Sequence, residues 1–309
     1  MSTLHTIDLN WTARPRSIAA VLLEFDSVRV LIDPGPESTV ETLRQHLKRL
    51  GAGVESLDAI LLTHIHLDHS GATGALVREN PRLPVYVHHI GAPHMADPAK
   101  LLASAGKLYG DRMQTLYGDF QPVPSENLRP LNGDEALQFG RGSLEVLYTP
   151  GHANHHVTYW DAEKRVAFVG DTAGLRVEGH SFLLPAVPPP DVNIELWNES
   201  LDAILRLNPE KLFLTHFGFS HDPKNHIERY REQLATWTAL VRRLMSDGLP
   251  PEDASRAFVE TVASDIKGTL SAADADHYIF NGGLELSWLG LARYVRKQDG
   301  TQTSAQNKS

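Results

Sequence analysis

One pattern that occurs twice restricts the fold of this chain more than any other feature. In the first half, the apolar segment 29–33 precedes a predicted helix and then the segment 60–64, which ends in Thr-His. In the second half, segment 165–171 precedes a predicted helix and then segment 212–216, which also ends in Thr-His. Strands that alternate with helices form α/β sheets, and such sheets usually bind ligands at the carboxyl ends of their strands. The sequence therefore predicts an α/β protein with two similar halves and histidines at strand ends.

The alternation of strands and helices gives the expected domain organisation. Residues 1–220 are predicted to form one catalytic α/β domain with a helical insertion at about 97–130. Residues 221–297 are helical in pattern and form a C-terminal extension, which is either a subdomain or a continuation of an outer layer. The polar residues 298–309 are predicted to be a flexible tail. Strands are expected at residues 19–25, 28–32, 58–63, 84–88, 144–148, 157–160, 166–169 and 211–215.

A dense group of potential metal ligands follows the strand at 58–63. The string reads Thr63-His64-Ile65-His66-Leu67-Asp68-His69-Ser70-Gly71. Side chains two residues apart leave an extended segment on the same face, so His64, His66 and Asp68 can converge, and a turn toward Gly71 brings His69 in. A lone histidine at a strand end is usually a hydrogen-bonded structural residue, but four ligand-type residues within six positions indicate a metal site.

One metal needs three or four ligands and two metals need more, so other strand ends must contribute. Three candidates follow strand signals in the second half, and they are His152, Asp171 and His216. The nitrogen and oxygen donors of these side chains suit Zn(II), while Fe, Mn and Co are also compatible with them.

Composition excludes several other functions. The chain has no cysteine, which excludes disulfides, thiolate catalysis and any cysteine-ligated metal. Its 29 Lys and Arg against 38 Asp and Glu give a net charge of −9, which opposes nucleic-acid binding. No apolar run approaches the roughly 18 residues that cross a bilayer, and no secretory signal is visible, so we expect no membrane partner and a cytoplasmic location.

The string His64-x-His66-x-Asp68-His69, with the later His152, Asp171 and His216, resembles the metallo-β-lactamase superfamily. The resemblance covers about residues 17–220. It implies an αβ/βα four-layer sandwich of two mixed β-sheets flanked by helices, with extra C-terminal helices here. Carried over to this chain, it implies that His64, His66 and His152 hold one metal. Asp68, His69 and His216 then hold the second metal, and Asp171 bridges the two.

Departures from the motifs of known branches narrow the resemblance. Members that destroy β-lactams usually carry a cysteine ligand or a different third motif, so that activity is not expected. Di-iron flavoproteins generally have Glu in place of His66, and glyoxalase II-like members usually have His in place of Ile65. The chain is most similar to the generic bacterial metallo-hydrolases and lactonases, although its helical C-terminal block is similar to that of glyoxalase II.

The resemblance and the ligand chemistry together imply a dinuclear metal-dependent hydrolase. A hydroxide that bridges two divalent cations, zinc in the first place and Fe or Mn otherwise, would cleave a small ester, thioester or lactone. Asp68 and Asp171 are the expected catalytic carboxylates, since both can orient the nucleophile and Asp68 can carry its proton to the leaving group. The alternatives are a mononuclear-iron enzyme similar to persulfide dioxygenases, a phosphoesterase or nuclease of the same superfamily, and a non-catalytic binding protein.

Weaker candidates surround this set. His155, His156, His94 and Tyr109 are candidate substrate contacts, with a phenol donor to an oxyanion implied by related lactonases. One of His155 and His156 is alternatively expected to donate a hydrogen bond to a metal ligand from behind. Thr63 and Thr215 are expected to hydrogen-bond to ligands, Asp33 to serve in a turn or helix cap, and His226 to be solvated. The partner is expected to be a small-molecule substrate, and apolar residues in the insertion are compatible with a homodimer.

Overall fold

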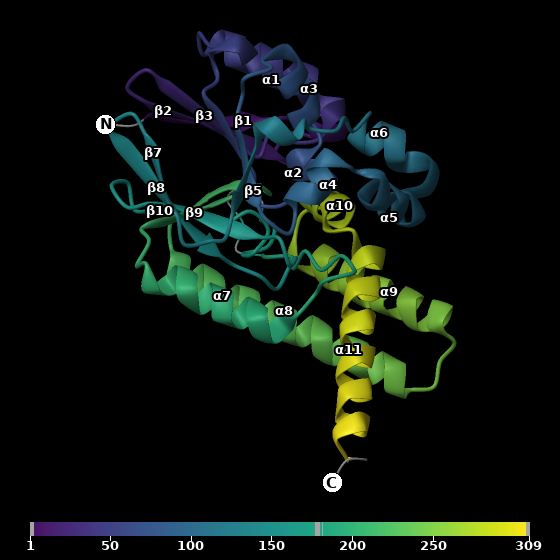
Figure 1. Cartoon of the computed structure of the whole chain (residues 1–309). Coiled ribbons are helices and arrows are strands. Elements are labelled where there is room, and N and C mark those ends of the chain that lie inside the picture. Colours follow the sequence, from purple (N-terminus) through teal and green to yellow (C-terminus); the bar gives the residue numbers. More distant parts are fainter. Residues whose placement is uncertain (1–2, 177–179, 181, 307–309) are drawn as a thin grey trace.

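Within residues 3–176, 180 and 182–306, which the computed structural model describes, two six-stranded sheets lie between layers of helices (Figure 1). Helices α1 (Val40–Arg49) and α3 (Thr73–Glu79) cover the outer face of the first sheet. Helices α7 (Ile194–Arg206) and α8 (Pro223–Ser246) cover the outer face of the second sheet. The predicted αβ/βα four-layer sandwich is therefore confirmed.

The first sheet is mixed. Its strands follow the order of the chain and are β1 (Thr3–Asp8), β2 (Ala19–Phe25), β3 (Val28–Ile32), β4 (Ala59–Leu61), β5 (Val85–His88) and β6 (Leu128–Leu131). The first three strands pair antiparallel, whereas β3 to β6 pair parallel. The parallel strands point their carboxyl ends at one edge, and the residues after β4 lie at that edge.

The second sheet is also mixed. Its order is β12 (Gly218–Ser220), β11 (Lys211–Leu214), β10 (Val166–Phe168), β9 (Val157–Asp161), β8 (Gly142–Tyr148) and β7 (Ala136–Phe139). Strands β10 and β11 pair parallel, and the other neighbours pair antiparallel. The carboxyl ends of β10 and β11 therefore lie side by side and carry Asp171 and His216.

Strand β2 shows how the sequence builds these layers. Ala20 and Leu22 pack toward the helices, while Val21 and Leu23 pack between the two sheets. Successive side chains on a strand point to opposite faces, so a strand covered on both faces must be apolar at every position. This requirement explains the nearly unbroken run of apolar residues in β2.

Several elements differ from the sequence prediction. Strands β1, β6, β7 and β12 were not predicted, since they are short or carry polar and Pro residues. The expected insertion contains helices α5 (Ala99–Tyr109) and α6 (Met113–Tyr117), and α4 (Ala92–Ala96) precedes it. The last residues of the expected insertion, 128–130, belong to β6.

The C-terminal helices continue the outer layer of the second sheet. Helices α9 (Pro251–Thr269), α10 (Ala272–Gly282) and α11 (Leu284–Gln306) follow α8. Phe258 and Trp288 belong to the same buried cluster as Leu212 of β11 and Trp197 of α7. Residues 298–306 of the predicted flexible tail belong to α11, and residues 307–309 lie outside the described residues. No helix in the described part of the chain is long and apolar enough to cross a membrane.

Candidate metal centre

The ligand-type side chains come from the carboxyl ends of strands in both sheets. His64, His66, Asp68 and His69 follow β4, and the last two lie on the short helix α2 (Leu67–Ser70). The facing sheet contributes three side chains, and these are His152 after β8, Asp171 after β10 and His216 after β11. All seven predicted ligands converge where the two sheets face each other.

Close packing in the loop before Asp171 requires glycine. Gly170 has a φ of +47°, a backbone conformation that favours glycine. A Cβ atom there would lie 2.6 Å from both His156 Nε2 and Thr63 Oγ1. Gly170 therefore allows the Asp171 loop to approach the strand end that carries His64.

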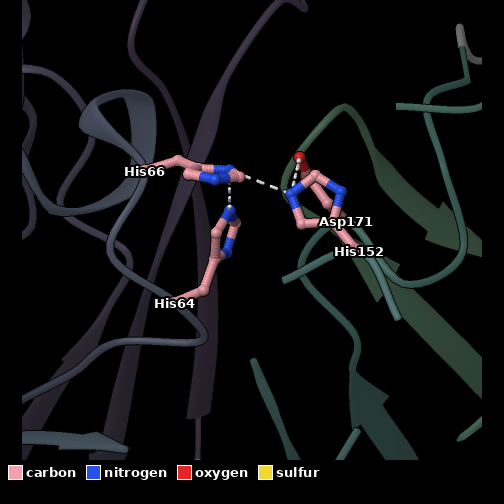
Figure 2. A group of neighbouring side chains, drawn as sticks. All are labelled: His64, His66, His152 and Asp171. Atoms are coloured by element: carbon pink, nitrogen blue, oxygen red, sulfur yellow. Dashed lines mark hydrogen bonds and ion pairs between the residues drawn. The ribbon is translucent and has the colours of Figure 1, made fainter. Parts of the chain in front are cut away.

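The first group consists of His64, His66, His152 and Asp171 (Figure 2). His66 Nδ1 lies 3.0 Å from His64 Nε2 and 2.9 Å from His152 Nε2. Asp171 Oδ2 lies 3.5 Å from His152 Nε2. Figure 2 shows the three rings pointing toward one another, with Asp171 beside His152.

The second group consists of Asp68, His69 and His216, and Asp171 connects it to the first. His216 Nε2 lies 3.3 Å from Asp68 Oδ2 and 3.5 Å from Asp171 Oδ1. His69 Nε2 lies 3.2 Å from the same Asp171 oxygen. The two carboxylate oxygens of Asp171 thus face different groups.

The imidazole rings of His152 and His216 each make a hydrogen bond on the side that faces away from the metal centre. These bonds determine which ring nitrogen presents a lone pair to the centre. His152 Nδ1 donates to the carbonyl of Ala186 and His216 Nδ1 donates to that of Ser17, each over 2.8 Å. A neutral imidazole has one N–H, so the Nε2 atoms of both rings present lone pairs to the centre.

Asp33 orients ligands of both groups. Its Oδ2 atom accepts from His69 Nδ1 over 2.8 Å, from Thr63 Oγ1 over 2.7 Å and from Thr215 Oγ1 over 3.0 Å. Because the Thr63 hydroxyl donates to Asp33, it accepts from His64 Nδ1 at 3.1 Å. The expected turn or capping role for Asp33 was wrong, since the buried carboxylate supports His69 directly and His64 through Thr63.

The two groups differ in their electrostatics. Burial lowers the pKa of His64 well below its ordinary value and lowers the pKa of His66 to about 3. Burial also opposes the charged form of His69 and His216, but the Asp171 carboxylate and its neighbours outweigh burial and raise both pKa values. Burial alone would raise the pKa of Asp68. The neighbouring His69 and His216 outweigh burial and lower this pKa to about 2.

The donor set fits divalent cations. Lone pairs of buried imidazoles and the oxygens of two carboxylates converge, an arrangement that is repulsive unless positive charge lies between them. Within the described part of the chain, His69 Nε2 and Asp171 Oδ1 are buried and make no hydrogen bond, although they lie 3.2 Å apart. Such atoms are costly to bury unless they bind a partner, and a metal ion satisfies both.

The weaker candidates are divided between the cavity and the protein interior. His155, His94 and Tyr109 line the cavity that adjoins the centre. His156 does not, because its ring is buried and accepts from the backbone N–H of Asp171 over 3.3 Å. It therefore positions the loop that carries Asp171, a placement behind a candidate ligand, while its contact with substrate stays a prediction.

Another expectation about a histidine was wrong. His226 lies in the first turn of α8 but is 5% exposed, and its Nε2 donates to the carbonyl of Ala173 over 2.9 Å. Burial lowers its pKa to about 4. Its position at a helix start suggested solvation, and the sequence carried no signal that the first turn of α8 packs behind the loop that follows Asp171.

An αβ/βα sandwich with five imidazoles and two carboxylates at the junction of its sheets defines the class of metallo-hydrolase folds. The family model described as the metallo-beta-lactamase superfamily matches residues 13–216. This chain belongs to the metallo-β-lactamase superfamily.

Three comparisons place it among known proteins. It is 26% identical over 235 residues to the metallo-beta-lactamase fold-containing protein ST1585 of Sulfurisphaera tokodaii, covering 75% of this chain and 84% of that protein. It is 27% identical over 240 residues to the hydroxyacylglutathione hydrolase of Aeromonas hydrophila, covering 74% of this chain and 73% of the enzyme. The structure of the metallo-beta-lactamase family protein TTHA1429 of Thermus thermophilus has a TM-score of 0.69 at 23% identity, covering 96% of this chain and 94% of the other. This last likeness includes the C-terminal helices in the shared fold.

Proposed function

We propose that this protein is a dinuclear metal-dependent hydrolase that cleaves a small ester, thioester or lactone. The observation that carries the proposal is the position of Asp171. Its Oδ2 lies 3.5 Å from His152 of the first group, and its Oδ1 lies 3.2 Å from His69 of the second. A carboxylate with one oxygen toward each group is suited to hold two cations, and zinc matches the nitrogen and oxygen donors.

Two divalent cations would supply a hydroxide at neutral pH and stabilise negative charge on an acyl oxygen. The exposure of the two carboxylates decides which of them can transfer a proton. Asp171 is buried, whereas the Asp68 side chain is 22% exposed and lines the cavity. Asp68 Oδ2 is thus placed to take the proton of the nucleophile and deliver it to the leaving atom.

The balance of the reaction is that of hydrolysis. A bond forms from the hydroxide oxygen to the acyl carbon, and the bond from that carbon to the leaving oxygen or sulfur breaks. The leaving atom receives the proton from Asp68, so the products are a carboxylic acid and an alcohol or thiol, or a hydroxy acid from a lactone. The similarity to a hydroxyacylglutathione hydrolase supports thioesters as one candidate class.

The test combines metal quantification with a panel of lactones, thioesters and phosphoesters on the zinc-loaded protein. We expect two metal ions per chain and turnover of an acyl substrate. Asp171→Asn should bind fewer than two metals and lose most of its turnover, whereas Asp265→Asn on the exposed face of α9 should behave as wild type.

Different results would select the alternatives. One iron per chain with oxygen uptake would replace the proposal by a mononuclear-iron oxygenase. Turnover of phosphoesters alone would replace it by a phosphoesterase. Full activity and two bound metals in Asp171→Asn would show that this carboxylate does not bridge the two groups.

A further inference from the structure

A cavity of about 460 Å³ adjoins the candidate metal centre. At the centre it is lined by Asp68, Asp171 and His216, so a ligand in the cavity can reach both groups. Away from the centre it extends between the α5–α6 insertion and the C-terminal helices α9 to α11. The cavity has the size of a small-molecule site.

The walls away from the metal centre are largely apolar. The insertion contributes Leu108 of α5 and Leu116 of α6, while the C-terminal helices contribute Phe280 of α10 and Leu286 of α11. Figure 1 shows α5, α6 and α10 on the same side of the two sheets. The C-terminal helices that form this wall lie beyond residues 13–216, which match the family model.

Charged side chains of the lining lie where solvent reaches them. Lys100, Arg112 and Glu285 line the cavity, and all three are exposed. The serine of the α11 wall, Ser287, is buried, and its hydroxyl donates to the Gly282 carbonyl. The lining also holds polar groups, and among them Asn281 Oδ1 is buried without a hydrogen-bond partner in the described part of the chain. An apolar acyl chain gains free energy where it covers the leucine and phenylalanine side chains of the walls.

We propose that this cavity binds an unbranched apolar acyl chain whose carbonyl carbon lies at the metal centre. The substrate class is then a medium- to long-chain acyl ester or thioester. This inference rests on the proposed hydrolase function for the chemical step, in which water cleaves the bond from the acyl carbon to oxygen or sulfur. For binding of the acyl chain, the inference rests only on the walls of the cavity.

The first experiment measures binding without turnover. Isothermal titration of the full-length protein with acetate, hexanoate and decanoate reports how affinity depends on chain length. We expect affinity to rise by up to about fourfold per methylene, which corresponds to about 0.8 kcal/mol. Equal affinity for acetate and decanoate would overturn the proposal, because the carboxylate alone would then account for binding.

Two matched variants on helix α11 test where the acyl chain binds. Leu286 of α11 lines the cavity, whereas Leu289, three residues later, is 45% exposed and does not line it. Leu286→Asp should reduce decanoate affinity at least tenfold and flatten the dependence on chain length, while Leu289→Asp should match wild type. Equal effects of the two substitutions would contradict the placement.

A second variant covers the case in which Leu286→Asp fails to fold. Ser104 of α5 lines the opposite wall and is exposed, so Ser104→Trp fills the cavity without disturbing a buried position. It should shorten the longest chain that binds tightly, with an unchanged melting temperature. Unchanged decanoate affinity in a folded Ser104→Trp protein would count against the proposal.

Turnover of acetyl, hexanoyl and decanoyl thioesters separates this inference from the proposed function. Tight decanoate binding with no turnover of any ester or thioester would leave the chain site standing and reject the hydrolase. Turnover that is independent of chain length, together with weak decanoate binding, would support the hydrolase and reject the chain site.

Discussion

The Oδ2 atom of Asp33 accepts a hydrogen bond from His69 Nδ1 over 2.8 Å, and both side chains are almost completely buried. Asp33 Oδ1 accepts from the backbone N–H of Thr63 over 2.8 Å. Thr63 in turn contacts His64, so one carboxylate outside the metal centre sets the orientation of a ligand in each group. Such outer hydrogen bonds fix the tautomer of a metal-binding imidazole and raise its basicity.

Asp33→Asn should weaken metal binding although Asp33 is not a ligand. If the Asn oxygen faces His69, its NH₂ group faces the Thr63 N–H, and one buried donor loses its acceptor. We expect a stability loss of about 1–3 kcal/mol and a metal affinity lowered roughly 10- to 100-fold. Chelator competition and thermal unfolding measure both effects, and an affinity equal to wild type would refute this role.

His155→Ala should leave both metals in place. His155 lines the cavity, and the only hydrogen bond that its ring makes among the described residues is with the Ile65 N–H, which it accepts over 3.4 Å. We expect two metals per chain and a kcat/KM lowered roughly tenfold, on the order of 1.4 kcal/mol. Metal analysis of the purified variant decides the matter, and a lost metal would make His155 a ligand.

Tyr109→Phe should lower kcat more than it changes KM. Tyr109 lines the cavity near Asp68, and burial raises its pKa to about 12, so its hydroxyl stays a proton donor at neutral pH. If it donates to the developing oxyanion, its loss lowers kcat roughly 100-fold. Metal content should not change, and Tyr148→Phe, outside the cavity lining, is the control. A change in KM alone would assign Tyr109 to substrate binding.

Acid should destabilise the protein through His226. Its pKa is about 4 in the folded state, against an ordinary value of 6.5. Between these pH values the unfolded chain binds more protons than the folded protein, so the free energy of unfolding rises with pH. The stabilising contribution of neutral His226 is therefore complete above about pH 6.5 and is lost as the pH falls to about 4. The shift corresponds to on the order of 3 kcal/mol.

Denaturant unfolding at several pH values measures this contribution. His226→Gln should flatten the pH dependence in that window, whereas the exposed His221→Gln should not. An identical slope in wild type and His226→Gln would assign the acid sensitivity to other groups.

The fold and the clustering of the seven candidate ligands were readable from sequence because they rest on local signals. The strand run before His64 is apolar on both faces, and the ligand motif lies within six residues. Asp171 and His216 were found because strand signals precede them. The supporting contacts were not readable, since Asp33 reaches His69 across 36 positions and Thr215 across 182 positions of the chain.

The missed elements have a similar cause. Strand β1 is only partly buried and β6 contains Pro130, so neither shows the apolar run of a central strand. The cavity walls combine α5 with α11, which are distant in sequence, and their apolar residues resemble ordinary core positions until the helices are placed together.

The junction between the sheets links metal binding to assembly of the whole domain. His64 and His69 belong to one sheet, and His152 and His216 to the other, so neither half alone offers a complete set of donors. A cation that binds here favours the closed sandwich over any state with separated sheets. Metal release and global unfolding should therefore be a single cooperative event, and a metal-sensitive dye would report denaturation of the protein.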